Sequence, residues 1–296
     1  MDAREGLAER FEGQRDRLRA VAHRMLGSPE EADDAVQEAW LRLSRVDADA
    51  VDNLDGWLRT VVTRICLDVL RTRTSRREDL AELPAFDEVP ASVAPDGPEG
   101  PEDTALLTDS VSRALLVVLD RLGPAERVVL VLHDMYAVPF HEIAPLVERT
   151  PVATKKLASR ARHKVRGTPV VPAADLARHR RVISAFLTAV RAGDLPAVLA
   201  LLDPDVVRRA DPTALPPGVA PELRGARAVA EGTLLFAHRS RQAEPALVNG
   251  TVGLLVAPHG RLRYALTFTI ENDLITGYEV FAAPARLRRL DIGVLD

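Results

Sequence analysis

The stretch that decides the fold in the middle of the chain is TPVATKKLASRARHKVRG (150–167). Thr150 followed by Pro151 is typical of a helix start, with a capping residue before a first-turn proline. The helix that follows carries many basic residues and neither Asp nor Glu. These basic residues are Lys155, Lys156, Arg160, Arg162, Lys164 and Arg166. The preceding segment, 139–149, predicts a short helix and a tight turn, so that together they predict a helix-turn-helix.

The charge of this helix predicts contact with the phosphates of nucleic acid. In a helix-turn-helix the second helix enters the major groove, and its N-terminal residues lie nearest to the bases. The expected contacts to a DNA duplex come from Thr154, Lys155, Lys156, Arg160, Arg162 and Lys164. We expect the first three to face base edges or nearby phosphates and the last three to hold the backbone. An exposed basic helix without a ligand is the alternative.

The length and composition limit which kinds of protein the chain can be. A length of 296 residues suggests about two domains, or three small ones. The net charge of −4 means that the basic helix is a local feature of an acidic chain. The single cysteine, Cys66, excludes an intramolecular disulfide and a cysteine-based metal cluster, and its apolar helical surroundings predict burial. The sequence shows no signal peptide and no apolar run near the ~20 residues of a membrane span, so we expect a cytoplasmic protein without metal or cofactor.

Three helices are predicted at the N-terminal end. Apolar residues recur at helical spacing over 7–25, and SPEE (28–31) combines a capping serine, a first-turn proline and a capping box. The helix that SPEE opens has one apolar and one acidic face. An acidic loop, 47–55, precedes a third helix. The polar positions of that helix carry Arg59, Arg64 and Arg71.

Behind the third helix the chain changes composition twice. A proline-rich acidic linker comes first, then the helical domain with the helix-turn-helix, and then an α+β domain in which helices precede strand-like runs. The predicted boundaries are 1–77, 78–108, 109–168 and 173–296. Within the linker, the apolar residues Leu83, Pro84 and Phe86 could dock on a neighbouring surface.

Two sets of motifs resemble the extracytoplasmic-function type of RNA polymerase sigma factor. Its second region is similar to SPEEADDAVQEAW (28–40), WL (57–58) and LDVLR (67–71), and its fourth to LGPAERV (122–128), EIA (142–144) and SRAR (159–162). The order and separation of the motifs match across 7–167. The resemblance implies two all-α domains, promoter-specific transcription initiation with core RNA polymerase, and no enzyme activity. Residues 173–296 resemble a SnoaL-like or nuclear-transport-factor-like α+β cone, which modulates activity in a subgroup of this family.

The resemblance also implies roles for particular residues. In this family the second-region helix docks on a coiled coil of the polymerase β′ subunit. The sigma factor also contacts a second part of the polymerase, the β flap. The positions that match the docking helix are Asp33, Asp34, Gln37 and Glu38. The acidic loop and third helix match the part that melts the minus-ten element, which implies DNA contacts from Asn53, Arg59, Arg64 and Arg71. The cone implies a cavity that can take a small-molecule ligand.

Three positions depart from the family pattern. Glu148 and Ala137 stand where glycine is common, and Thr154 stands where an aliphatic residue is common. If such a position needs a positive φ, a residue other than glycine costs on the order of 1 kcal/mol.

Two alternatives stay open. The first is a helix-turn-helix regulator that binds DNA without polymerase. The second is a ligand-binding or isomerase-like C-terminal domain as the main activity. Residue types suited to such chemistry are Asp211, His238, Tyr264, Glu271, Asp273, Tyr278 and Glu279, although their spacing forms no recognisable constellation.

Overall fold

The structure, a computed structural model, describes residues 3–46, 53–82 and 112–295. Contacts between Cα atoms divide the chain into two units. The N-terminal unit comprises Met1–Asp109 and Leu119–Arg162, and the C-terminal unit comprises Ser110–Val118 and His163–Asp296. The predicted docking residues of the linker, Leu83, Pro84 and Phe86, lie outside the described residues.

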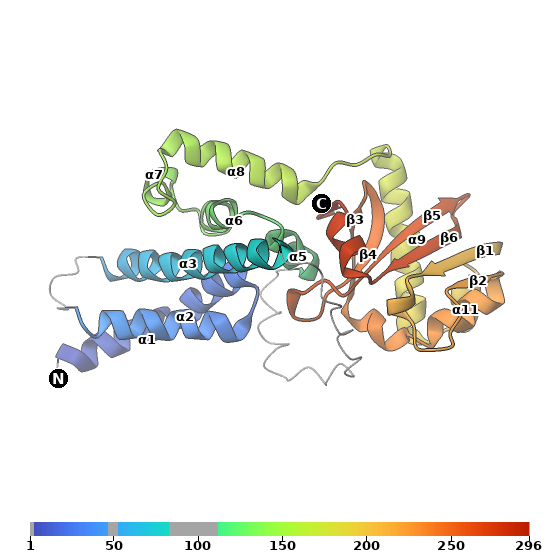
Figure 1. Ribbon diagram of the computed structural model, residues 1–296, viewed down its shortest axis with the longest axis horizontal. Coiled ribbons are helices and arrows are strands. Elements are labelled where there is room, and N and C mark those ends of the chain that lie inside the picture. Colours follow the sequence, from blue (N-terminus) through green and yellow to red (C-terminus); the bar gives the residue numbers. More distant parts are fainter. Residues whose placement is uncertain (1–2, 47–52, 83–111, 296) are drawn as a thin grey trace. The chain divides into compact units, whose positions relative to one another are not determined.

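The N-terminal unit begins with three helices that pack alongside one another (Figure 1). They are α1 (Ala3–Leu26), α2 (Pro29–Leu43) and α3 (Leu54–Glu82). Ser28 caps α2, and its Oγ accepts a hydrogen bond of 3.4 Å from the backbone N–H of Glu31, as the capping serine predicts. The carboxylate of Glu31 pairs with Arg73 and does not complete the predicted capping box. The core between the helices includes Met25, Leu43 and Leu58, all fully buried. Cys66 is buried among them, and burial raises the pKa of its thiol to about 12.

The helix-turn-helix is built from short pieces. These are α6 (Pro124–Leu130), a π-helical turn (Val131–Met135), α7 (Phe140–Ile143) and α8 (Pro151–Arg166). Ala137 and Glu148 have φ angles of 53° and 56°, so the two positions where glycine is common do adopt the left-handed conformation. At Glu148 this conformation lets the N–H of Arg149 donate to the carbonyl of Ala144 over 3.0 Å, which closes the turn after α7.

The C-terminal unit is a seven-stranded sheet in the order β2-β1-β6-β5-β4-β3-β7. Its strands are β1 (Leu202–Ala210), β2 (Glu222–Arg224), β3 (Ala243–Val248), β4 (Thr251–Val256), β5 (Tyr264–Glu271), β6 (Leu274–Phe281) and β7 (Ile292–Gly293). Neighbouring strands pair antiparallel except β1 with β6, which pair parallel. The accompanying helices are α9 (Ala173–Ala192), α10 (Leu195–Leu199), α11 (Ala226–Leu234) and α12 (Pro284–Arg289), with short 3-10 turns η3 (Pro212–Ala214), η4 (Ala237–Gln242) and η5 (Pro258–Gly260).

Each face of the sheet carries an apolar core. Along β4, Leu254 and Val256 belong to a core shared with α9, α10 and α11, whereas Leu255 belongs to a second core on the opposite face. This alternation follows from the period of two along a strand.

A helix from far upstream covers part of the second face. Helix α5 (Arg113–Asp120) contributes Ala114, Val117 and Val118 to the second core, and the N–H of Ala114 donates to the carboxylate of Glu244 over 3.2 Å. The end of α8 also belongs to this unit, because the N–H of Val294 donates to the carbonyl of Val165 over 2.8 Å. The sequence assigns both segments to the helix-turn-helix domain, but in the structure they contact the sheet. The predicted domain boundaries themselves stay a prediction.

None of the described helices combines the length and the apolar character that a membrane-spanning segment requires.

Candidate nucleic-acid interface

The exposed face of α8 is cationic. Thr150 caps the helix, with its Oγ1 accepting from the N–H of Ala153 over 3.2 Å. Lys155, Lys156 and Arg160 are exposed, and within the described residues none of them forms an ion pair. Lys156 and Arg160 are four residues apart and so share one face of the helix, with Lys155 next to Lys156 at the edge of that face. This side can therefore meet phosphates without first giving up an internal partner.

Two predicted contact residues of α8 are engaged within the protein. Thr154 is completely buried, and its hydroxyl donates to the carbonyl of Thr150 over 3.0 Å. The prediction that Thr154 faces DNA bases is therefore wrong for this conformation. Arg162 donates two hydrogen bonds of 2.7 Å to the carboxylate of Asp134, and this pairing raises the pKa of Arg162. Its guanidinium thus holds α8 against the π-helical turn Val131–Met135.

Val152 is a candidate contact that the sequence analysis missed. Its side chain is 69% exposed in the first turn of α8, one turn before Lys155 and Lys156. An exposed aliphatic residue at that place suits contact with the methyl group of a thymine in the major groove. The available signal was its spacing, because the residues three and four positions after it are the two lysines.

The acidic face of α2 is exposed as predicted, but its members differ. Asp33 accepts two hydrogen bonds from Arg19, the longer one 2.8 Å, and Glu38 accepts one of 3.0 Å from Arg42. Asp34 and Gln37 are exposed, and in the described part of the chain Asp34 forms no ion pair. These two residues are the part of the face that remains open to a partner.

The predicted single-strand contacts on α3 are largely occupied. Arg59 pairs with Glu142 at 2.8 Å and Arg71 pairs with Glu148 at 3.2 Å, so that two carboxylates of the helix-turn-helix lie on this basic helix. Arg64 is exposed and forms no ion pair within the described residues.

Asn53 also has a structural role, as the residue that caps the start of α3. Its Oδ1 accepts from the N–H of Gly56 over 3.0 Å. A Cβ at position 56 would approach the Asn53 side chain to 2.9 Å, so a larger residue there would push the capping amide of Asn53 aside. Asn53 can therefore offer DNA only its amide N–H groups while the cap is intact. Most of the acidic loop before it, residues 47–52, lies outside the described residues.

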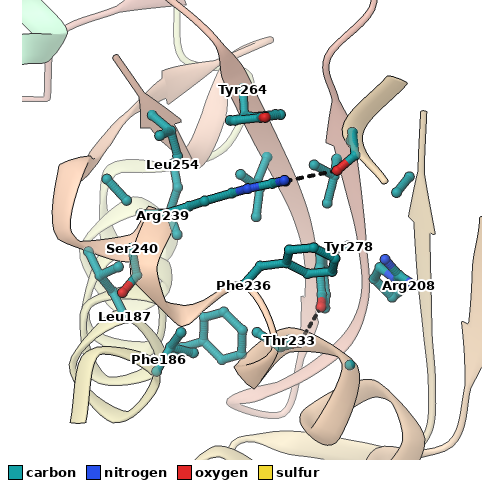
Figure 2. A pocket seen from close by; sticks show the side chains of 18 of the residues that line it. Phe186, Leu187, Arg208, Thr233, Phe236, Arg239, Ser240, Leu254, Tyr264 and Tyr278 are labelled. Carbon is teal, nitrogen blue, oxygen red and sulfur yellow. Dashed lines mark hydrogen bonds between the residues drawn. The ribbon is translucent and has the colours of Figure 1, made fainter. Parts of the chain in front are cut away.

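The C-terminal unit contains a pocket of about 100 Å³, open on one side, between α9, α11, η4 and the sheet (Figure 2). Its wall is mostly aliphatic and aromatic, with Phe186, Phe236 and Leu254 prominent. Of the residue types suited to catalysis, Tyr264 and Tyr278 line it, whereas His238 and the four carboxylates do not. Burial raises the pKa of Tyr278, which therefore stays a neutral phenol.

Asp211 has a structural role outside this cavity. Burial by itself would raise the pKa of its carboxyl, but the N–H groups of Ala282 and Ala283 and the guanidinium of Arg286 outweigh burial and lower it. The carboxylate thereby ties the start of η3 to the end of β6. Among the described residues, no group of three His, Cys, Asp or Glu side chains is placed to hold a metal ion.

Comparison with known proteins gives concordant matches. The family description "Sigma-70 region 2" matches residues 11–76. The probable ECF RNA polymerase sigma factor SigI of Mycobacterium tuberculosis is 36% identical over 270 residues, which cover 90% of this chain and 90% of that protein. The ECF RNA polymerase sigma factor SigJ of the same organism is 36% identical over 255 residues, covering 83% and 80%. The crystal structure of SigJ is 30% identical and covers 95% of this chain and 98% of that chain, with a TM-score of 0.46.

Proposed function

Since the chain belongs to the extracytoplasmic-function family of RNA polymerase sigma factors, we propose that it directs core RNA polymerase to promoters through the exposed faces of α2, α3 and α8. The N-terminal helical sigma region and the C-terminal α+β unit that the sequence predicts are confirmed, and the C-terminal unit has a mixed sheet. The cationic face of α8, open in the structure, is the observation that carries the proposal for duplex DNA. A regulator that acts without polymerase is not favoured, because the relatives are sigma factors along most of their length.

Duplex DNA of the upstream promoter element would be read by α8. Lys155, Lys156 and Arg160 supply phosphate contacts, and Val152 supplies an apolar contact to a base. Arg162 keeps α8 in place through two hydrogen bonds to Asp134, whereas Arg59 and Arg71 each form one to their carboxylate, and Arg162 would therefore not contact DNA. Lys164 is exposed near the end of the helix and would contact a DNA phosphate further along the duplex.

Polymerase would be bound by the acidic face of α2. Asp34 and Gln37 are its open residues, and they would contact the coiled coil of the β′ subunit, while the helix-turn-helix part would approach the β flap. The paired carboxylates of Asp33 and Glu38 fix the arginines beside them and shape the edge of this surface.

The melted strand of the downstream element would lie along α3. Arg64 is available at once, whereas Arg59 and Arg71 must exchange Glu142 and Glu148 for phosphates. Both pairs are partly exposed, and such pairs contribute about 0–1 kcal/mol each, so polymerase binding can readily overcome them. The free protein would accordingly bind single-stranded DNA weakly, and the double variant E142Q/E148Q would bind it more tightly.

The C-terminal unit would regulate these surfaces. Helix α5 and the end of α8 belong to its fold, so any change in that unit acts directly on two elements flanking the helix-turn-helix. We propose that a small molecule bound in the cavity supplies such a change. An isomerase-like reaction has less support, because no carboxylate or histidine lines the cavity as described.

In vitro transcription with core RNA polymerase tests the proposal. The full chain is used, because Ala114, Val117 and Val118 of α5 and the last turn of α8 pack in the C-terminal unit. Specific transcripts from the unaltered protein are expected. Asp34→Lys should abolish both core binding and transcription but leave duplex binding intact. Glu9→Lys, which reverses an exposed acid on α1, is the matched control and should leave all three unchanged. Full transcription by the Asp34→Lys variant would refute the docking surface.

A further inference from the structure

Arg208 is a buried cation without a counter-ion. It lies on β1, lines the cavity, and is only 4% exposed. Its Nη2 donates to the carbonyl of Ala220 over 3.1 Å, and within the described residues it forms no ion pair. A guanidinium carries five N–H donors, so most of its capacity is unused. Buried charges in proteins are ordinarily paired, because removing them from water is costly.

A second cation borders the same cavity. The guanidinium of Arg239 lies between the rings of Phe236 and Tyr264, 4.6 Å from each centroid, and its Nη1 donates to the carbonyl of Ala214 over 2.8 Å. Figure 2 shows this side chain reaching across the cavity from the wall opposite to Tyr278 and Arg208. No Asp or Glu is among the described residues that line the space. The cavity therefore favours negative charge.

The hydroxyl groups of the wall do not compete for this role. Thr233 donates its one hydroxyl hydrogen to the carbonyl of Val229 over 2.7 Å. The phenol of Tyr278 lies 2.5 Å from the same threonine oxygen and must then donate its own hydrogen there. The phenol oxygen thus faces the cavity as an acceptor. Donors for an anionic group come from the arginines.

We propose that the cavity binds a small, mostly apolar molecule carrying one carboxylate, which Arg208 holds. The apolar wall suits a hydrocarbon body. The volume of about 100 Å³ is smaller than the roughly 150 Å³ of an apolar cavity that takes up benzene, so the pocket holds a short chain or a single ring that extends from its mouth. A monocyclic or short-chain carboxylic acid fits both conditions. The planar fork of Arg208 suits two parallel hydrogen bonds to a carboxylate. This inference deepens the small-molecule proposal above and rests on it.

Calorimetric titration of the full chain with benzoate, and with its neutral isostere nitrobenzene, tests the proposal. We expect benzoate to bind at least about tenfold more tightly, since a hydrogen bond to a charged group carries that much. Arg208→Gln keeps a donor for the Ala220 carbonyl and should lower benzoate affinity at least about tenfold, with nitrobenzene changed less than about twofold. Arg239→Gln should lower benzoate affinity in the same direction. It serves as a second variant should Arg208→Gln misfold. Arg209→Gln, which alters the next residue of β1 on its exposed side, is the matched control and should leave both affinities unchanged.

The outcomes separate the two proposals. Preferential benzoate binding that Arg208→Gln removes supports the carboxylate class. Equal or tighter binding of nitrobenzene overturns that class but supports a ligand cavity. If neither benzoate nor nitrobenzene binds, both the carboxylate class and the ligand cavity are overturned. The titration contains no polymerase, so its result does not depend on transcription activity.

Discussion

We expect Arg160 and Arg162 of α8 to differ in how much each contributes to the salt dependence of DNA binding. Each phosphate that a protein neutralises adds about −0.9 to the slope of log affinity against log salt concentration. Arg160 is exposed without an ion pair in the described chain, so Arg160→Ala should make the slope shallower by about 0.9. Arg162 is held by Asp134, so Arg162→Ala should leave the slope unchanged. Because that pair is partly exposed, its loss should cost about 0.2–1 kcal/mol of stability.

The assay is fluorescence anisotropy of a labelled promoter duplex titrated with full-length protein in a series of KCl concentrations. Lys155→Ala should behave as Arg160→Ala does, because the two residues share the exposed face. Thermal unfolding of each variant separates lost phosphate contacts from lost structure. A shallower slope for Arg162→Ala together with an unchanged slope for Arg160→Ala would refute the assignment of the α8 faces.

Three further predictions concern stability and reactivity. Ala137→Gly should stabilise the protein by about 0.5–1 kcal/mol, because relief of roughly 1–2 kcal/mol of left-handed strain exceeds the entropic cost of glycine; Ala20→Gly, within α1, should instead cost about 1 kcal/mol in the same urea titration. A loss of stability in Ala137→Gly would contradict the strain. The lowered pKa of Asp211 contributes stability that is present at neutral pH and is lost as pH falls through that lowered pKa. Asp211→Asn should therefore lose about 1.5–3 kcal/mol at pH 7 and flatten the acid limb of the unfolding curve; an unchanged acid limb would argue against the clamp. The thiol of Cys66, with its pKa of about 12, should resist a disulfide reagent at pH 8 until urea opens α3, and rapid labelling of the native protein would count against its burial.

Local patterns predict local structure well in this chain. The SPEE motif opens α2 through its serine cap, because a cap depends on residues three positions apart. The turn at Glu148 and the bend at Ala137 were likewise foreseeable, since the backbone there must turn left whatever residue occupies the position. The family motifs then supplied the order of the helical regions.

Properties that depend on distant partners could not be predicted in the same way. Helical spacing shows that α8 is basic, but only packing shows that Thr154 faces inward and that Arg162 meets Asp134. Asp211 is a residue type that can act in catalysis. In the fold, however, its carboxylate accepts hydrogen bonds from Arg286 and from backbone amides. The sequence could not predict that Arg208 lacks a counter-ion, because the residues next to it in the chain do not show which side chains surround it in the fold.

The membership of α5 in the C-terminal sheet imposes an order on biosynthesis. The apolar side chains of Ala114, Val117 and Val118 leave the ribosome before the helix-turn-helix does, but the strands that cover them end only at Gly293. At ~5–20 residues per second, this interval lasts on the order of ten seconds or more. Throughout it, a newly made apolar helix is exposed to chaperones and to neighbouring nascent chains. The strand residues up to Ile292 must therefore have been made before α5 acquires its full apolar support.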